Sequence, residues 1–427
     1  MSRARLITRR GFLKRAGLVA VAAPWLVPRT VLGTPARRAP SERVTLGIIG
    51  LKKMGREHVR NLLGHGGVQI LAVCDVDTTA RNEAQHQVEE TYGAAQRDGH
   101  YTGCAAYNEY ERIMERADID AVVLAVPEHW HAIMAIAACR AGKDVYCEKP
   151  LSLTIREAQE MVRVARRYGT VFQTGSQQRS SANFRLACEL VRSGRIGEVK
   201  TVNVGVGPPS TEIYLPEEPV PPGLDYERWL GPAPWKPYHH LRCGSYYEDG
   251  WRRIRDYSGG KMTDWGAHHF DIAQWGLGMD GGGPVEIIPP NGQTGAPLTY
   301  RYANGVLVQH GGADGVLFTG TEGKLEVNRD HLTTWPASIR KSPLGPNEVH
   351  LYESRGHYED WLHCIRTRGR PICDVAIGAT SVIVCHLGNI AWWLGRTLHW
   401  DPARQELVGD DIAARWLDRP KRAPYRL

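Results

Sequence analysis

The segment VTLGIIGLKKMGREHVRNLL, residues 44–63, decides how the first half of the chain folds. Its first seven residues form the continuous apolar run of a buried parallel strand, and its last ten repeat apolar side chains at helical spacing. Gly50 and Gly55 match the first and last glycines of the dinucleotide-binding pattern G-x-G-x-x-G, whereas Lys52 stands where the middle glycine is expected. The segment therefore predicts a strand, a phosphate-binding turn and a helix.

Lys52 changes how that turn is expected to hold a cofactor. The middle glycine of the pattern lets the backbone approach the pyrophosphate, so a Cβ at this position pushes the pyrophosphate outward or requires a backbone shift. In return, the ammonium groups of Lys52 and Lys53 would meet its charge at the positive end of the following helix. We expect the turn to retain a dinucleotide, and its cofactor-binding candidates are Gly50, Leu51, Lys52, Met54 and Gly55.

From residue 43 onward, short apolar runs alternate with amphipathic stretches, which is typical of βαβ units around a parallel sheet. The run at 68–75 predicts the second strand and ends at Asp75, 20 residues beyond Gly55. A carboxylate there suits the ribose hydroxyls of adenosine and repels a 2′-phosphate, so it favours NAD and makes NADP the weaker candidate. The simpler interpretation of Asp75 is an ordinary carboxylate at a strand end.

Later segments continue this alternation of strands and helices. Strands are expected at 120–127, 144–150 and 170–175, with helices at 129–143 and 155–169. Ligands bind at the carboxyl ends of the strands in such sheets. The residues that fall at these ends are Gly50, Asp75, Pro127 and Lys149. This coincidence supports a dinucleotide site more strongly than the incomplete glycine pattern does.

The first 33 residues differ from the rest of the chain. An arginine pair, Arg9 and Arg10, precedes a short apolar run at 16–27, which is the pattern of a twin-arginine export signal. We therefore expect a signal peptide at 1–33, a linker at 34–42, and an exported or periplasmic protein. No cysteine follows the apolar run and no apolar stretch of about 18 residues lies in the body of the chain, so no stable membrane anchor is expected.

The expected signal accounts for the positive charge of the chain. The formal net charge is +7, from 53 Lys and Arg against 46 Asp and Glu. Residues 1–33 hold seven basic residues and no acidic ones, which leaves 46 basic against 46 acidic residues. A neutral mature protein gives no electrostatic reason to expect nucleic acid as a partner. The nine cysteines include no C-x-x-C pair, so neither a zinc site nor a redox dithiol is indicated, while disulfide pairing stays open.

Several motifs together resemble the Gfo/Idh/MocA oxidoreductase family, whose name combines glucose-fructose oxidoreductase, inositol dehydrogenase and a rhizopine-catabolism protein. The matching segments are the turn from Gly50 to Gly55, VCDVD (73–77), VPEHWH (126–131), CEKP (147–150) and GGKMTDWGAHHFDIAQW (259–275). The most specific feature is the combination of EKP after a strand with D-x-x-x-H about 115 residues later. The resemblance covers nearly all of the chain after the signal.

The resemblance implies an α/β fold in two domains. An N-terminal Rossmann dinucleotide-binding domain would occupy 43–172, and a C-terminal α/β domain with a large, mostly antiparallel sheet would occupy 173–427. Because the family uses the open face of that sheet for substrate or oligomer contacts, a homo-oligomer through this sheet is expected. Agreeing with that outline are strand-like runs at 197–207, 284–290, 298–312 and 315–329 and helix-like runs at 357–369 and 379–395.

The resemblance also assigns catalytic roles, with Lys149 as the catalytic lysine, His268 as the acid/base and Asp264 as an assisting carboxylate. Oxidation of a secondary alcohol needs a base for the hydroxyl proton, and a lysine beside the developing alkoxide stabilises it. Asp264 and His268 are four residues apart, so on one helix they would share a face and the carboxylate would orient the imidazole or hold the substrate. The alternative for His268 is a satisfied core histidine. Further cofactor-site candidates are Pro127, His131 and Glu148.

Residues 225–275 are rich in tryptophan and tyrosine, although the whole chain has only five phenylalanines. Aromatic side chains with a polar group suit partly wet pockets and stack on sugars, whereas the alternative is a large core or an oligomer interface. The candidates for substrate contact are Arg179, Trp251 and His269, and secondarily Arg252 and Arg253. His239 and His240 have no third ligand at metal spacing, so no metal site is expected.

The export route sharpens the functional hypothesis. A protein with a twin-arginine signal crosses the membrane folded and arrives where nicotinamide cofactors are not supplied, so an enzyme must keep its NAD and restore it in each turnover. The first hypothesis is an oxidoreductase that acts on a secondary hydroxyl of a sugar, cyclitol or glycoside with retained NAD. The alternatives are an NAD-dependent glycosidase that works by transient oxidation and elimination, and a non-catalytic sugar-binding or scaffold protein with a degenerate cofactor site.

Overall fold

A computed structural model gives the fold of residues 42–97, 101–244 and 250–427. Contacts within the chain make Val44–Leu427 one compact unit, separate from the residues before it. The expected signal and all but the last residue of the expected linker lie outside the described residues. Both sheets of the protein belong to this compact unit.

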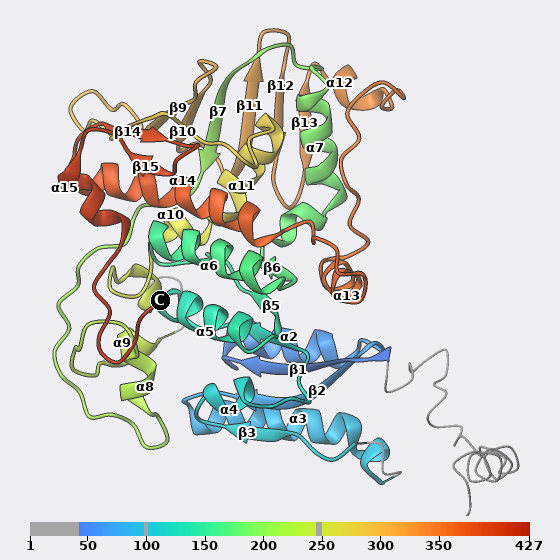
Figure 1. The fold of residues 1–427 in the computed structure, drawn as a ribbon. Coiled ribbons are helices and arrows are strands. Elements are labelled where there is room, and N and C mark those ends of the chain that lie inside the picture. The colour runs from blue at the N-terminus through green and yellow to red at the C-terminus, as the bar shows by residue number, and fades with distance from the viewer. Residues whose placement is uncertain (1–41, 98–100, 245–249) are drawn as a thin grey trace, which may run out of the picture. The chain divides into compact units, whose positions relative to one another are not determined.

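Six parallel strands form the first sheet, in the order β3-β2-β1-β4-β5-β6 (Figure 1). Their bounds are β1 Val44–Ile49, β2 Val68–Cys74, β3 Ala105–Tyr107, β4 Ala121–Leu124, β5 Asp144–Cys147 and β6 Phe172–Thr174. β4 and β5 are buried along their whole length, as expected for parallel strands covered on both faces. The strand order reverses between β1 and β4, which is where ligands bind in sheets of this kind. The predicted Rossmann sheet is confirmed.

Helices connect these strands: α2 Lys53–Leu63, α3 Thr78–Arg97, α4 Glu111–Met114, α5 Glu128–Arg140 and α6 Ile155–Tyr168. The sequence sets the ends of α6 clearly. The Thr154 hydroxyl accepts a hydrogen bond from the Glu157 N–H, while the Glu157 carboxylate accepts one from the Leu153 N–H. This reciprocal cap satisfies amides that the first helical turn leaves unpaired. Gly169 then ends the helix in the left-handed conformation, with φ of 64°.

Nine strands form the second sheet, in the order β13-β12-β11-β7-β10-β9-β8-β14-β15. Their bounds are β7 Val199–Gly205, β8 Glu286–Ile288, β9 Thr299–Arg301, β10 Leu307–His310, β11 Gly315–Gly320, β12 Lys324–Val327, β13 Leu332–Trp335, β14 Leu398–Asp401 and β15 Glu406–Leu407. Only the pair formed by β7 and β10 is parallel among the described strands of this sheet. The prediction of a mostly antiparallel second sheet is confirmed.

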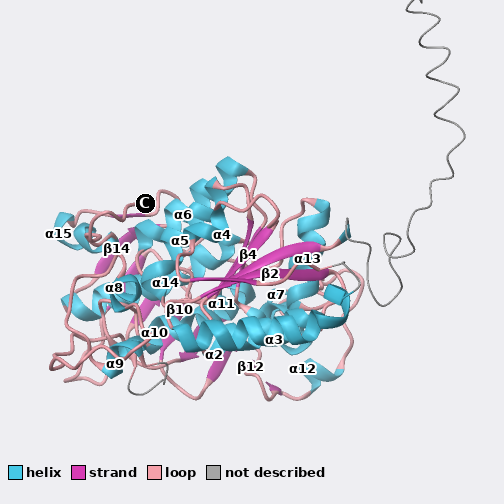
Figure 2. Cartoon of the chain, turned by 90° about the horizontal axis from the view of Figure 1, so that it is seen from below, coloured by secondary structure: helices cyan, strands magenta, loops and turns pink. Residues whose placement is uncertain are grey.

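The longest described helices that pack against the second sheet are α7 Ala182–Arg192, α11 Gly266–Leu277 and α14 Val375–Leu394 (Figures 1 and 2). α14 also contacts α6, so it lies between the second sheet and the helices of the first. Among the described residues, α14 alone is long and apolar enough to cross a membrane by length and composition, but 78% of its most apolar window is buried inside the fold. Its apolar composition is accounted for by its place in the core.

The remaining described α-helices are α13 His357–Thr367 and five short ones: α8 Tyr226–Leu230, α9 His240–Cys243, α10 Lys261–Asp264, α12 Ser338–Lys341 and α15 Asp411–Ala414. The connection from β7 to α8 is long and runs from the second sheet to the first, along the left edge of Figure 1. All nine cysteines are free thiols, and eight of them are buried.

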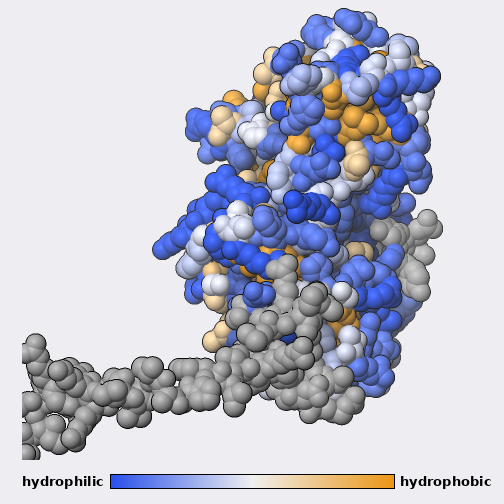
Figure 3. Space-filling view, turned by 90° about the vertical axis from the view of Figure 1, so that its right-hand side faces the viewer, coloured by the Kyte–Doolittle hydropathy of each residue, from blue (hydrophilic) through white to orange (hydrophobic). Residues whose placement is uncertain are grey.

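Alternate residues of β7 face opposite sides of the second sheet. Val202 and Val204 are buried, whereas Thr201 and Asn203 on the other side are half-buried. Figure 3 views the molecule from the right-hand side of Figure 1 and shows a largely hydrophilic surface whose most extensive apolar area lies near its top. Oligomer formation through the sheet stays a prediction.

The domain boundary expected after residue 172 would fall inside β6, and because Val44–Leu427 is one compact unit, that division also stays a prediction.

Candidate active site

A cavity of about 530 Å³ lies at the carboxyl ends of β1, β2, β4 and β5. It collects most of the residues that the sequence indicated, although they are spread over more than 200 positions of the chain. The predicted residues that line it are Gly50, Leu51, Lys52, Met54, Asp75, Pro127, His131, Glu148, Lys149, Trp251, Asp264 and His268. Gly55, Arg179 and His269 are not among its lining residues.

The backbone of the turn from Gly50 to Gly55 accounts for which of its positions are glycine. Gly50 has φ of +85°, and a Cβ built there would lie 2.4 Å from the Ala125 carbonyl oxygen. A Cβ at Gly55 would lie 1.9 Å from the Gly50 oxygen, so both positions require glycine. Lys52 instead has φ of −82° and ψ of −168°, an extended conformation that any residue adopts. The missing middle glycine therefore leaves the turn intact.

The first turn of α2 faces the cavity without a side-chain cap. Lys52 is the N-cap residue and its side chain makes no capping hydrogen bond, and no acidic residue lies in the first turn. Lys52, Lys53 and Met54 all line the cavity there. Backbone N–H groups at a helix N-terminus bind phosphate oxygens, so this end of the cavity fits a pyrophosphate.

Two carboxylates mark the adjoining end of the cavity. The half-buried Asp75 carboxylate accepts hydrogen bonds from the Leu51 N–H at 2.7 Å and the Asp77 N–H at 2.8 Å. Burial raises the pKa of Asp75, while these two amide donors oppose the rise. The Lys52 ammonium lies 2.8 Å from the Asp77 carboxylate. In this structure, then, Lys52 meets a carboxylate at the ribose end, and its predicted contact with the pyrophosphate stays a prediction.

At the other end of the cavity, Lys149 meets the D-x-x-x-H segment. The Lys149 ammonium donates hydrogen bonds to the Asp264 carboxylate at 2.8 Å and to the Asp264 carbonyl oxygen at 3.1 Å. The other carboxylate oxygen of Asp264 and the Nδ1 atom of His268 are buried and have no hydrogen-bond partner among the described residues. Buried polar atoms normally have partners. Both residues line the cavity, so a ligand that brings hydroxyl groups is suited to supply the missing partners.

The imidazole of His268 is set up as an uncharged base. Burial, together with the nearby cations of Lys149 and Arg329, holds the pKa of His268 well below its ordinary value. The ring packs edge-on against Trp265, with centroids 5.8 Å apart. A neutral imidazole with a free ring nitrogen accepts a proton, so the environment favours the base over the acid form.

One expectation about this segment is wrong. Asp264 and His268 do not share one continuous helix, because α10 ends at Asp264 and α11 begins at Gly266, with Trp265 between them. No hydrogen bond joins the two side chains among the described residues, and the carboxylate faces Lys149 instead. The Lys149 ammonium is a charged donor and forms a stronger hydrogen bond with the Asp264 carboxylate than the neutral imidazole would. Asp264 therefore orients the lysine rather than the histidine.

Glu148 holds the backbone next to Lys149 in place through a hydrogen-bond network. Its carboxylate accepts hydrogen bonds from His58 Nε2 at 3.1 Å and Gln177 Nε2 at 3.2 Å, and from the Lys149 N–H at 3.2 Å. Although burial opposes ionisation, the bond from His58 keeps the pKa of Glu148 below its ordinary value. His58 is completely buried, and its Nδ1 lies 2.7 Å from the Tyr358 hydroxyl. This buried network fixes the backbone that carries the lysine.

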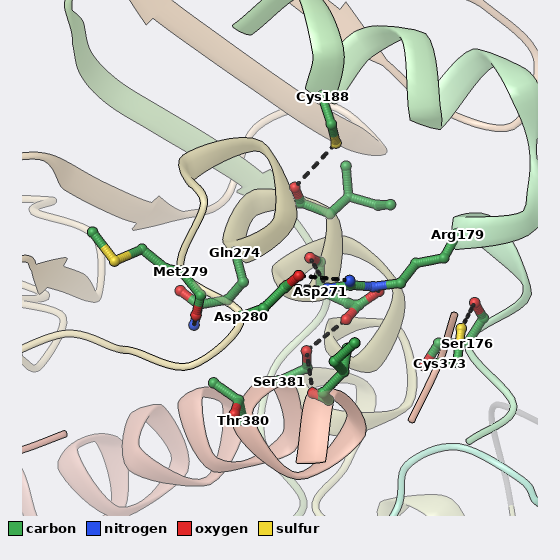
Figure 4. A network of polar contacts seen from close by, with 12 residues as sticks. Ser176, Arg179, Cys188, Asp271, Gln274, Met279, Asp280, Cys373, Thr380 and Ser381 are labelled. Carbon is green, nitrogen blue, oxygen red and sulfur yellow. Dashed lines mark hydrogen bonds and ion pairs between the residues drawn. The ribbon is translucent and has the colours of Figure 1, made fainter. Parts of the chain in front are cut away.

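The predicted contact of Arg179 with the substrate is wrong. Its guanidinium is buried and donates to Asp271 at 2.7 Å and to Asp280 at 2.7 Å (Figure 4). Asp271 also accepts from the Ser381 hydroxyl at 2.6 Å, so the network ties α11 to α14. Two carboxylates use the charge that was expected to bind substrate. An arginine buried this deeply must be paired, and here the pairing is internal.

His269 is also placed away from the cavity. Its Nδ1 lies 3.0 Å from the Gly205 carbonyl oxygen, and the ring packs on Trp265. The expected contact between His269 and a substrate is therefore not found, and the residue has a structural role at the end of β7. Trp251 does line the cavity, and the guanidinium of Arg252 lies over its ring at 4.4 Å.

His239 and His240 do have a third polar partner, which the sequence analysis missed. Glu218 brings its carboxylate to both histidines, and the three donor atoms lie within 4.8 Å of one another. The carboxylate lies 2.9 Å from both the His240 N–H and its Nδ1. His239 Nδ1 accepts from the Leu241 N–H, so its Nε2 carries the proton and points to Glu218 at 3.3 Å. The reason given against a metal at His239 and His240, the lack of a third ligand, is therefore wrong, and the absence of a metal stays a prediction.

The most informative residue that sequence reasoning missed is Arg329. It lines the cavity from the turn between β12 and β13, and its guanidinium lies 4.7 Å from the centre of the Trp265 ring. No motif marks this turn, because an arginine between two short strands is ordinary in sequence. Gln177 and Gln178 also line the cavity, directly after β6. Their position after a strand of the parallel sheet was the only available signal.

Two family models match the chain. Residues 44–176 match an oxidoreductase family, NAD-binding Rossmann fold, and residues 209–427 match an oxidoreductase family, C-terminal alpha/beta domain, both of the Gfo/Idh/MocA group. A myo-inositol 2-dehydrogenase of Thermotoga maritima is 25% identical over 367 residues, which are 82% of this chain and 93% of that protein.

Two further relatives differ in how much they cover. A glycosyl hydrolase family 109 protein of Shewanella pealeana is 31% identical over 212 residues, but the match spans only 45% of this chain and 44% of that protein. A solved structure of the WlbA dehydrogenase from Bordetella pertussis in complex with NADH and UDP-GlcNAcA superposes with a TM-score of 0.58. That match covers 84% of this chain and 99% of the other at 17% identity, so it reports on the fold alone.

Proposed function

We propose that this chain, which belongs to the Gfo/Idh/MocA oxidoreductase family, oxidises and reduces a secondary hydroxyl of a sugar, cyclitol or glycoside. The observation that carries the proposal is the meeting of Lys149, Asp264 and His268 in one cavity. There, one oxygen of Asp264 and one nitrogen of His268 are buried without partners among the described residues. Both atoms suit a polyhydroxylated ligand.

The residues present fit a bound nicotinamide dinucleotide. The turn from Gly50 to Gly55 and the uncapped start of α2 would hold its pyrophosphate, and Asp75 would hold the adenosine ribose. When bound, the nicotinamide supplies a hydride acceptor or, in its reduced form, a hydride donor. We assign NAD rather than NADP because Asp75 and Asp77 together carry more negative charge at the ribose end than Lys52 offsets.

The protein's own groups divide the remaining work. His268 accepts the hydroxyl proton at a ring nitrogen, because its lowered pKa keeps the imidazole uncharged near neutral pH. Lys149 stabilises the developing alkoxide by charge and hydrogen bonding. Asp264 holds the lysine ammonium through one oxygen and leaves the other for a neighbouring hydroxyl of the substrate. Arg252 and Arg329 line the same cavity and are suited to orienting further hydroxyls.

We further propose that NAD stays bound and is restored in each turnover. The twin-arginine pattern at Arg9 and Arg10 supports an exported, periplasmic protein, and such an enzyme works outside the supply of free cofactor. Paired oxidation and reduction of two sugars would meet this condition. An oligomer through the second sheet remains part of the proposal because sheet faces of this kind commonly pair.

A second function is favoured by one observation, the partial match to a glycosyl hydrolase family 109 protein. In that reaction, oxidation of a sugar hydroxyl to a ketone acidifies the neighbouring C–H. A base removes that proton, the aglycone leaves with its bonding electrons, water adds to the double bond, and reduction of the ketone restores the hydroxyl. No net oxidation occurs, so the cycle also returns the cofactor to its starting state.

The decisive experiment compares Lys149→Ala with Lys200→Ala, an exposed lysine on the second sheet that serves as control. Native mass spectrometry first determines whether the purified protein carries a nicotinamide dinucleotide. Turnover is then measured on a panel of free sugars, cyclitols and aryl glycosides. We expect Lys149→Ala to lose about a thousandfold in kcat and Lys200→Ala to retain it. Tight sugar binding without turnover in the unaltered protein would instead favour a non-catalytic sugar-binding protein.

A further inference from the structure

The long connection between the two sheets forms part of the proposed cofactor site. We call residues 206–230, from the end of β7 through α8, the strap. Its far end is hydrogen-bonded to the segment that follows β2. The Thr78 N–H donates to the Gly223 carbonyl oxygen at 2.9 Å, and the Asp225 N–H donates to the Val76 carbonyl oxygen at 3.0 Å. The strap thus lies against the strand end that carries Asp75 and Asp77.

One side-chain hydrogen bond joins the strap to β3. Asn108, directly after β3, donates from Nδ2 to Asp225 Oδ2 at 2.8 Å. Arg81 donates to the Oδ1 atom of the same amide at 3.3 Å, so Nδ2 is turned toward the strap. The other carboxylate oxygen of Asp225 caps α8 by accepting from the Arg228 N–H at 3.1 Å. Asp225 therefore both begins α8 and holds it to the first sheet.

The strap also has a small apolar core of its own. Tyr226, Trp229 and Leu230 of α8 pack with Trp251 and three neighbours in a cluster separate from the main core, and the strap residue Leu224 packs against it. The Trp229 carbonyl oxygen accepts from the Trp130 indole N–H at 3.0 Å, which ties the cluster to α5. A small core that is separate from the main one opens at lower free energy than the rest of the protein.

The inner side of the strap lines the cavity. Leu224, Arg228 and Trp229 face it from the strap, while Asp75, Asp77 and Asn108 line it from the first sheet. An adenosine held at Asp75 would lie among these residues. Arg228 is the cation that the strap contributes here, and it lies 3.5 Å from Glu111 and 3.7 Å from Glu109 on the first-sheet side, and 3.6 Å from Asp225 of the strap itself.

We propose that the strap is the outer wall of the adenosine pocket and that the Asn108–Asp225 hydrogen bond is a latch that slows the release of NAD. This inference rests on the proposed NAD site and deepens it. The Rossmann turn holds the pyrophosphate, but the strap decides how long the dinucleotide stays. A cofactor that is regenerated while it stays bound requires slow release, which such a hydrogen bond would provide.

The test uses an exchange of the two latch side chains in the full-length protein loaded with NADH. Asn108→Asp places a second carboxylate against Asp225 and should speed NADH release about tenfold, because a hydrogen bond becomes a like-charge contact. The double variant Asn108→Asp with Asp225→Asn restores the hydrogen bond in the opposite direction, and asparagine still caps α8. It should return the release rate to within about twofold of the unaltered protein. Release is followed by the loss of NADH fluorescence after mixing with excess NAD.

Asn304→Asp serves as the control, since it adds the same charge at an exposed turn of the second sheet, where the Asn304 side chain accepts only a local backbone hydrogen bond. Asn108→Ala, which removes the hydrogen bond without adding charge, replaces Asn108→Asp if the latter does not fold. Unchanged release in the latch variants would overturn the latch while leaving the oxidoreductase proposal standing. Fast release that the double variant does not reverse would also overturn it, by showing that Asn108 acts directly on the ligand. Failure of the unaltered protein to bind any nicotinamide would overturn the proposed function itself.

Discussion

The two sheets contribute to one cavity in different ways. The first sheet presents the ends of neighbouring parallel strands, so Gly50, Asp75 and Lys149 arrive together through backbone register alone. The second sheet contributes no strand end of this kind, and its side chains come from short helices and turns such as α10 and the turn that carries Arg329. The cofactor half of the cavity is thus determined by local motifs, and the reactive half by tertiary packing.

The largest effect is expected from a substitution of His268, which removes the function of the reactive half of the cavity and leaves the cofactor half unchanged. His268→Asn should reduce kcat by about a thousandfold and leave NADH affinity within about twofold, because the base is lost while the strand-end residues remain. In the unaltered protein, kcat/KM for oxidation should stay level as the pH falls from 8 to 6, because burial holds the pKa of His268 well below its ordinary value and the base remains uncharged. Steady-state kinetics across pH provides the measurement. A decline centred near the ordinary histidine value would contradict the assigned role.

The next effect breaks the cofactor half alone. Gly50→Ala puts a Cβ at a residue with φ of +85°, 2.4 Å from the Ala125 carbonyl oxygen, so the turn must move. We expect NADH affinity to fall about a hundredfold by titration calorimetry. Gly281→Ala is the matched control, since a Cβ there meets nothing within 4 Å. Equal affinity in the two variants would mean that the turn does not hold the dinucleotide.

A smaller effect comes from Glu128, which starts α5 beside both halves. Burial raises the pKa of Glu128 to about 8, and its carboxyl contacts the Ser258 hydroxyl at 2.6 Å. The folded protein therefore binds a proton that the unfolded chain has released, so this group loses stabilising free energy as the pH rises from about 4.5 to about 8. The loss approaches about 1.4 kcal/mol per pH unit. In Glu128→Gln, the free energy of unfolding measured by urea titration should depend less on pH across this range. An unchanged pH dependence would refute the buried protonated carboxyl.

The smallest effect concerns Lys52. Its ion pair with Asp77 is half exposed, so it contributes little free energy. We expect Lys52→Gly to weaken NADH binding by only about threefold to fivefold, because the backbone at this position already accepts any residue. Titration calorimetry beside Gly50→Ala gives the comparison directly. Unchanged or stronger retention would make Lys52 a tolerated departure from the glycine pattern and remove its proposed part in holding the pyrophosphate.

What the sequence could predict follows the same division. The strand ends, the turn and α6 were predictable because apolar runs, glycines and caps act over a few residues. Asp264 was located but given the wrong partner, because the break at Trp265 depends on packing and not on spacing. Arg179 was misassigned since its carboxylate partners, Asp271 and Asp280, lie about a hundred residues away in the chain.

The strap shows the limit most clearly. Its proline-rich sequence has no periodicity, so neither its path to the first sheet nor the pairing of Asn108 with Asp225 was foreseeable. Arg329 was unforeseeable for a related reason, because a turn between short strands acquires its place only when the whole sheet has formed. Residues that act across such distances are found by structure alone.

The contact between Lys149 and Asp264 has a consequence for how such proteins diversify. It is one joint at which the dinucleotide-holding part of the chain meets the part that lines the rest of the cavity. As long as this joint is kept, the turns and short helices of the second part can change and admit new substrates, while the first part remains as it is. A contact of this kind lets the substrate-lining part of a protein vary without changing how the cofactor is held.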